Sequence, residues 1–111
     1  MQIARGIVDA LEDKKAEDIL LIDLQGVASF ADYFIITTGT SDRMLNSLAK
    51  SVIEKAKTDY ELRGTAEGQP EYGWVVVDLG DIIVHLFSPE QRDYYQLEEL
   101  WQEGRVLLRL Q

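Results

Sequence analysis

The fold of this chain is decided by residues 73–87, which read GWVVVDLGDIIVHLF. Two apolar runs, 74–78 and 81–87, flank the pair Leu79-Gly80. Apolar, β-branched runs around a glycine at so short a spacing are typical of a β-hairpin. The stretch therefore predicts two antiparallel strands joined by a tight turn.

If Leu79-Gly80 forms the loop of this hairpin, Asp78 faces Asp81 and Trp74 faces His85, all on one side of the sheet. Two carboxylates and an imidazole are candidate metal ligands. They would be spread along the hairpin, however, which makes a shared ion awkward. We therefore predict no metal site, and interpret these residues as a solvated turn with a hydrogen-bonded histidine, or as a surface that meets Arg or Lys of a partner.

Upstream of the hairpin, helix and strand signals alternate. Apolar spacing predicts a short helix over residues 3–11, and the apolar run 18–24 predicts a strand buried on both faces. Residues 32–38 (DYFIITT) are the clearest strand, since aromatic and β-branched side chains dominate them. Gly39 ends this strand, and a Thr or Ser cap begins a helix whose wide apolar stripe runs over residues 44–56.

The remaining segments complete the element order. Residues 62–67 predict a short strand and 67–73 a loop. Ser88-Pro89 begins a helix that Gly104 ends, and residues 105–110 are either a last edge strand or a loose tail. On one face of that helix we expect Tyr94, Leu97, Glu98 and Trp101. The fold class is therefore α/β: a single domain over residues 1–111, with a mixed β-sheet flanked by helices.

Composition limits the classes of function. The 111 residues include no cysteine, 11 Lys and Arg and 20 Asp and Glu, for a net charge of −9. The lack of cysteine excludes thiol chemistry and a disulfide framework. The acidity disfavours bare nucleic acid and anionic membranes, and suits a basic protein partner or solubility alone. No signal peptide or membrane span is evident, so we expect a cytoplasmic protein.

Catalytic motifs are weak. The Gly39-Thr40-Ser41 turn precedes a helix N-terminus, where backbone N–H groups can hold a phosphate, as in nucleotidyltransferases. Those enzymes also need a D-x-D carboxylate pair, whereas this chain offers the D-x-x-D of residues 78–81. His85 is the single histidine and has no G-x-S-x-G elbow beside it. We predict no catalytic residues and no cofactor, and retain a nucleotide-binding enzyme as the alternative function.

Residues 94–101 (YYQLEELW) are dense in aromatic and acidic side chains. Leu97, Leu100 and Trp101 recur at the spacing of one helix face, so part of this segment is expected to pack in the core. The remaining aromatic and acidic side chains cannot all face inward as well. Exposed aromatic residues rimmed by acids are typical of a protein-binding surface.

Residues 73–87, the following segment 92–101 and the upstream DYFIITTGTS of residues 32–41 resemble the Iojap family, the ribosomal silencing factors (RsfS). The resemblance runs from about Ile7 to Trp101, and leaves the tail 103–111 unassigned. It implies a nucleotidyltransferase-like topology without that activity. It also implies binding to the large ribosomal subunit through ribosomal protein L-fourteen. Bound there, the protein would block joining of the small subunit and repress translation when nutrients are limiting.

The residues that match the family's motif are Trp74, Asp78, Asp81, His85, Tyr95, Leu97, Glu98 and Trp101. The resemblance implies that the three acids meet basic groups of the partner, and that the aromatic residues and Leu97 supply apolar contact. His85 is assigned to structure or to the rim. Met44 stands where many relatives carry a histidine in a G-T-S-x-x-H pattern. A homodimer off the ribosome is compatible with this account.

A nucleotide-binding test distinguishes the enzyme hypothesis from the protein-binding hypothesis. If the protein is a nucleotide-binding enzyme, ATP or CTP with magnesium should raise its unfolding temperature, and Asp78→Asn should remove the effect. If it is a protein-binding module, nucleotide should shift the unfolding temperature of neither the parent nor Asp78→Asn. The measurement is thermal unfolding with and without nucleotide.

Overall fold

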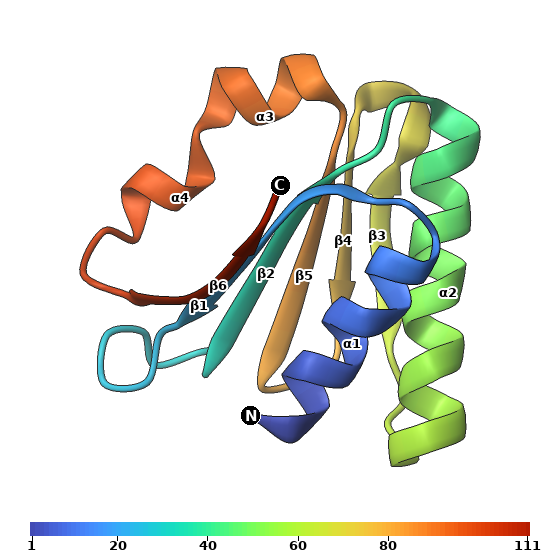
Figure 1. Ribbon diagram of the computed structural model, residues 1–111. Coiled ribbons are helices and arrows are strands. Elements are labelled where there is room, and N and C mark those ends of the chain that lie inside the picture. The colour runs from blue at the N-terminus through green and yellow to red at the C-terminus, as the bar shows by residue number, and fades with distance from the viewer.

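A computed structural model describes all 111 residues as a six-stranded mixed sheet with helices on both faces (Figure 1). In chain order the elements are α1 (Gln2–Asp13), β1 (Glu17–Asp23), β2 (Tyr33–Thr38), α2 (Asp42–Tyr60), β3 (Thr65–Gln69), the 3-10 turn η1 (Pro70–Tyr72), β4 (Trp74–Asp78), β5 (Ile82–Phe87), α3 (Pro89–Tyr95), α4 (Leu97–Leu100) and β6 (Arg105–Leu110). The strand order is β3-β4-β5-β2-β1-β6. β2 and β5 are parallel, and the other neighbouring pairs are antiparallel. The predicted α/β class is confirmed.

The β4–β5 hairpin forms, but its predicted register was wrong. Asp78 pairs with Ile83 and Trp74 with Phe87, so His85 lies opposite Val76. The turn centres one residue later than predicted, on Gly80 and Asp81, because Gly80 takes up the positive φ of 95° that glycine adopts without strain. The side of the sheet that each residue faces is unchanged, since the register moved by an even number of residues.

Two further predictions were wrong. The strand predicted over 62–67 is β3, which covers Thr65–Gln69, so the predicted loop over 67–73 is partly strand. Its sequence, TAEGQ, has little β-propensity, and pairing with β4 is what makes it extended. The single helix predicted after Ser88 is broken at Gln96, which adopts a left-handed conformation with φ 48° between α3 and α4.

Local signals placed the caps correctly. The Ser41 hydroxyl accepts a hydrogen bond from the Met44 N–H at the start of α2, and Ser88 does the same for Gln91 at the start of α3. Residues 105–110 are an edge strand rather than a loose tail: β6 pairs with β1, and Arg105 and Arg109 form ion pairs with Asp23 and Asp18.

The two faces of the sheet are covered unequally. Helices α1 and α2 pack on one face over a cluster of 19 buried residues, whereas α3, α4 and the β1–β2 connection pack on the other over a cluster of eight (Figure 1). Along β4, Val75 and Val77 are buried under α2, while Trp74 and Val76 are half-buried and Asp78 is exposed. The short helices α3 and α4 therefore leave part of the second face open to solvent.

We expect Leu48→Ala to lower the free energy of unfolding by about 2–5 kcal/mol, because Leu48 is fully buried between α2 and the sheet. Leu100→Ala is the matched control, since Leu100 is 72 % exposed and should cost well under about 1 kcal/mol. Urea unfolding measures both. Equal losses in the two variants would contradict the placement of the main core under α2.

Candidate protein-binding site

A continuous string of rings crosses the face of the sheet that carries α3 and α4. We call it the aromatic face, and it comprises Phe30, Phe34, Trp74, His85, Phe87, Tyr94, Tyr95 and Trp101. The Trp74 and Tyr95 centroids are 4.6 Å apart, and His85 lies 4.6 Å from Phe34, which joins the two halves. Tyr94 is 77 % exposed and Phe30 53 %. Exposed aromatic rings that pack against a buried aromatic cluster are typical of a protein-binding surface.

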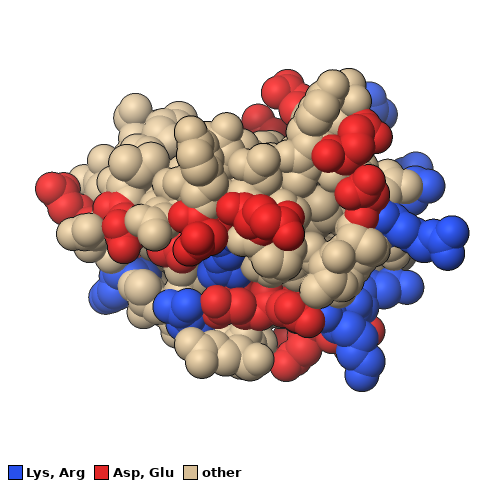
Figure 2. All heavy atoms as spheres, turned by 90° about the horizontal axis from the view of Figure 1, so that it is seen from above, with Lys and Arg blue, Asp and Glu red and all other residues tan.

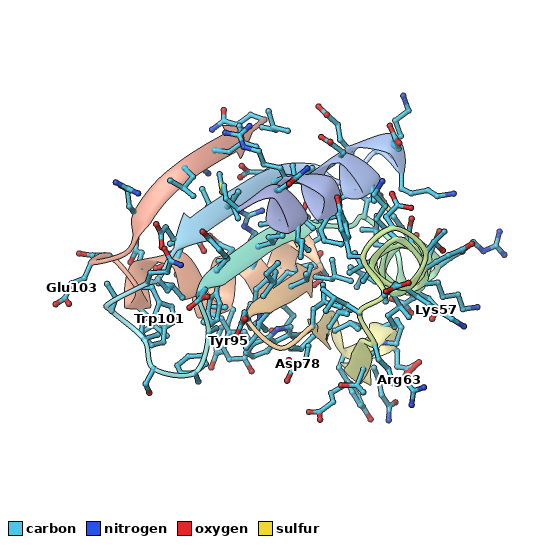
Figure 3. The ribbon with its side chains drawn as sticks, turned by 90° about the horizontal axis from the view of Figure 1, so that it is seen from below. Lys57, Arg63, Asp78, Tyr95, Trp101 and Glu103 are labelled. Atoms are coloured by element: carbon cyan, nitrogen blue, oxygen red, sulfur yellow. The ribbon has the colours of Figure 1, made fainter.

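Charge is segregated between the two sides of the molecule. The segment from Glu67 to Glu103 carries nine carboxylates, and its one basic residue, Arg92, is buried. Seven of the 11 basic residues come instead from the end of α1, from α2 and from the loop after it: Lys14, Lys15, Arg43, Lys50, Lys55, Lys57 and Arg63. Figure 2 shows a large group of basic side chains on the right of the molecule and a smaller group at the lower left, and Figure 3 places Lys57 and Arg63 at the end away from Trp101. The aromatic face is therefore also the acidic face.

Arg92 holds three elements together beneath this face. Its Nη1 donates to the Asp18 carbonyl oxygen at 2.6 Å and to the Thr38 hydroxyl at 3.0 Å, and its Nε lies 3.8 Å from a Glu98 carboxylate oxygen. Asp18 also accepts two hydrogen bonds from Arg109, which lower the pKa of its carboxyl. Glu98 is thus turned toward an internal cation, although sequence reasoning had placed it against a partner.

The structure brings together most of the residues predicted to bind a partner. Trp74, Tyr95 and Trp101 belong to the aromatic face, and Asp78 lies on the same side of β4 as Trp74. Asp81 is exposed in the β4–β5 turn, where its carbonyl oxygen accepts from the N–H groups of Asp32 and Tyr33. Leu97 is only 9 % exposed and packs in the smaller core cluster.

His85 is buried against Trp74. Its Nδ1 accepts a hydrogen bond from the Trp74 indole Nε1–H at 3.2 Å, so the neutral ring carries its proton on Nε2. Burial lowers the pKa of His85 from 6.5 to about 4, because the charged form would lose its hydration. The histidine therefore orients the tryptophan, which is half-buried and also packs against Phe87 and Tyr95.

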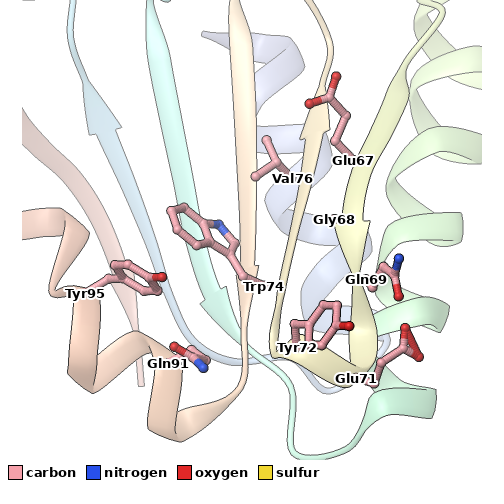
Figure 4. A pocket seen from close by; sticks show the side chains of 9 residues that line it. All are labelled: Glu67, Gly68, Gln69, Glu71, Tyr72, Trp74, Val76, Gln91 and Tyr95. Carbon is pink, nitrogen blue, oxygen red and sulfur yellow. The ribbon is translucent and has the colours of Figure 1, made fainter.

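A pocket of about 570 Å³ opens beside Trp74 at the β3 edge of the sheet (Figure 4). We call it the edge pocket; it is lined by Glu67, Gly68, Gln69, Glu71, Tyr72, Trp74, Val76, Gln91 and Tyr95. Sequence reasoning did not single out Glu67, Glu71 or Tyr72: it placed Glu67 where a predicted strand meets a loop, and the other two within that loop. The signal that could have found them is a tyrosine flanked by acidic and turn-forming residues.

Comparison with known proteins decides the family. The model of the family "Ribosomal silencing factor during starvation" matches residues 1–110. The chain is 44 % identical to ribosomal silencing factor RsfS of Bacillus subtilis, over 83 % of this chain and 78 % of the relative. It is 33 % identical to a mouse protein named mitochondrial assembly of ribosomal large subunit protein 1, over 86 % of this chain and 43 % of that one. A crystal structure of a Chromobacterium violaceum protein superposes with a TM-score of 0.86 at 38 % identity, and the match covers 91 % of this chain and 84 % of that one.

The chain belongs to the ribosomal silencing factor family. The family match extends through β6, which sequence reasoning had left outside the recognisable motif. The nucleotidyltransferase-like topology expected for the family remains a prediction.

The glycine turn of this silencing-factor chain is internally hydrogen-bonded. The Thr40 N–H donates to the Met44 sulfur at 3.3 Å, and the Met44 N–H donates to the Ser41 hydroxyl. Met44 therefore engages the turn directly, and the N–H groups of Thr40 and Met44 both have partners within the turn. No three His, Asp or Glu side chains come together as a metal site would require, and none of the helices has the length and apolarity to cross a membrane.

The buried histidine predicts a pH dependence of stability. Between pH 6.5 and about 4 the unfolded chain binds a proton at His85 that the folded chain does not, so stability falls as the pH falls through this window. The loss from this group should reach about 3 kcal/mol and be absent in His85→Gln, which keeps an acceptor for Trp74. Urea unfolding at several pH values measures the difference between the two proteins. An NMR titration of this single histidine with a midpoint near 6.5 would contradict the assignment.

Proposed function

We propose that this protein is a cytoplasmic ribosomal silencing factor. It binds the large ribosomal subunit through ribosomal protein L-fourteen, blocks joining of the small subunit and represses translation when nutrients are limiting. The observation that carries the proposal is the coincidence of the aromatic face with the acidic face in a chain of the silencing-factor family. The name of the mouse relative, which refers to the large ribosomal subunit, supports the choice of partner.

The charge and the exposed rings have separate roles in this docking. Long-range attraction between an acidic face and a basic ribosomal protein speeds encounter and sets orientation. Desolvated aromatic residues then supply most of the binding free energy. The molecule measures 35 × 33 × 24 Å, so one side is large enough for an interface of about 800 Å².

Silencing by this mechanism requires only that the bound protein fill space on the large subunit that the small subunit would otherwise occupy. Two surfaces contact each other when their atoms approach within about 4 Å. A body at least 24 Å thick between the two ribosomal subunits would keep the surfaces beneath it far beyond that distance. No bond is made or broken, which agrees with a chain in which we assign no catalytic residue.

The residues that we propose to contact the partner differ in how accessible they are to it. Asp78 and Asp81 are exposed and form no ion pair within the chain, although Asp78 accepts a hydrogen bond from the Gly80 N–H. Glu98, by contrast, is already partly neutralised by Arg92. Trp74, Tyr95 and Trp101 offer apolar contact. Leu97 contributes mainly by packing α4 on the sheet, and His85 by orienting Trp74.

A second copy of this chain can cover the same face when no ribosome is bound. We propose that such a homodimer forms off the ribosome and dissociates on docking. Apolar rings otherwise exposed to water would be buried in both states.

Asp78→Lys should weaken binding to isolated large subunits by about tenfold or more, because it places a cation against a basic partner. Asp9→Lys is the matched control: it makes the same charge change on the exposed side of α1, on the opposite face of the sheet. Co-sedimentation at increasing salt measures both, with circular dichroism to check folding. Unchanged binding by Asp78→Lys would remove β4 from the proposed interface.

A further inference from the structure

The edge pocket combines aromatic and acidic walls. Trp74 and Tyr95 form one wall, with ring centroids 4.6 Å apart and planes inclined by 49°. Tyr72, which is 71 % exposed, lies on another side, and the carboxylates of Glu67 and Glu71 border the opening toward β3 (Figure 4). A concave site of this composition has the two features that attract an organic cation.

The indole of Trp74 has no free polar atom to offer a ligand. Its N–H is already committed to the hydrogen bond with His85, so Trp74 contributes ring carbon atoms and their π-electrons to the pocket lining. Tyr95 packs against the same indole and is still 44 % exposed. The negative face of an aromatic ring attracts a cation held within about 6 Å of its centre.

The carboxylates of the pocket are uncommitted. Neither Glu67 nor Glu71 takes part in an ion pair or a side-chain hydrogen bond, and no Lys or Arg lines the pocket. By contrast, Glu98 and Asp18 on the same side of the sheet are paired with arginines of this chain. The pocket therefore carries negative charge that only an external group can neutralise.

We infer that the edge pocket binds an arginine side chain of the protein on which this chain docks. A planar guanidinium stacks on Trp and Tyr while its five N–H donors reach carboxylates and the amide oxygens of Gln69 or Gln91. A lysine ammonium is more compact and more strongly hydrated, and cannot stack in this way. The inference rests on the proposed function for the identity of the partner, but the chemistry of the pocket is testable without it.

The first experiment titrates the whole protein with N-acetyl-arginine amide and follows the Trp74 indole N–H by NMR. The two tryptophan signals are assigned with a Trp101→Phe variant. We expect a saturable shift of the Trp74 signal that the uncharged isostere N-acetyl-citrulline amide does not produce. No saturable shift, or an equal shift with citrulline, would overturn the inference. Equal affinity for N-acetyl-lysine amide would overturn the choice of arginine.

Two charge-matched variants localise the effect. Glu67→Gln/Glu71→Gln should weaken arginine-amide binding about fivefold or more. Glu12→Gln/Glu54→Gln removes two exposed carboxylates from α1 and α2, on the opposite face of the sheet, and should change it less than about twofold. Thermal unfolding checks that both variants fold. Equal weakening in the two variants would mean that net charge, and not the pocket, attracts the ligand.

Binding of the same variants to large subunits separates this inference from the proposed function. If the parent protein binds large subunits and only the pocket variant loses about tenfold in affinity, both stand. If all three proteins bind equally, the proposed function stands and the pocket inference fails. If the parent binds arginine amide but no ribosomal subunit, the pocket chemistry stands and the proposed partner is wrong.

Discussion

The pairing of β4 with β5 is the interaction on which the rest of the structure depends. It sends Val75 and Val77 into the main core, and sets Trp74, Val76 and Asp78 on the other face. It also places His85 where its Nδ1 can accept the hydrogen bond of Trp74. A shift of one residue in this pairing would exchange the buried and open sides of the strand, and would remove both the core and the candidate site.

The open face persists because the elements that cover it are short. The break at Gln96 directs Leu97 toward the sheet, and Arg92 links α3 to β1, β2 and α4 by hydrogen bonds and ion pairs. The rigid helix layer on the opposite face carries most of the basic residues. A small acidic protein thereby presents one aromatic surface with a defined polarity, which suits docking on a basic protein.

Features with a local cause could be predicted from the sequence. β2 follows from its β-branched run, and α2 from its Ser41 cap and wide apolar stripe. Alternation along β4 was enough to place Trp74 and Asp78 on one side of the sheet. The hairpin register was not predictable in this way, because Leu79-Gly80 and Gly80-Asp81 are both plausible two-residue turns and differ only in which position takes the positive φ.

Features with a distant cause could not be predicted. β3 is extended because β4 pairs with it, and its own residues favour a loop. The end of α3 depends on burial of Leu97, which is not encoded in helix propensity. The edge pocket exists because β3–β4 pairing and α3 bring Glu67, Tyr72 and Tyr95 around one indole. Composition indicated a protein-binding surface but could not indicate a concave cation site within it.

The central claim, that this chain keeps the ribosomal subunits apart by occupying the large one, is tested most directly by reassociation. Purified protein is mixed with isolated large or small subunits, pelleted at several salt concentrations, and then added to both subunits together. The account predicts salt-sensitive pelleting with the large subunit alone and a reduced yield of joined ribosomes. Pelleting with neither subunit, or binding to the large subunit without any loss of joining, would contradict it.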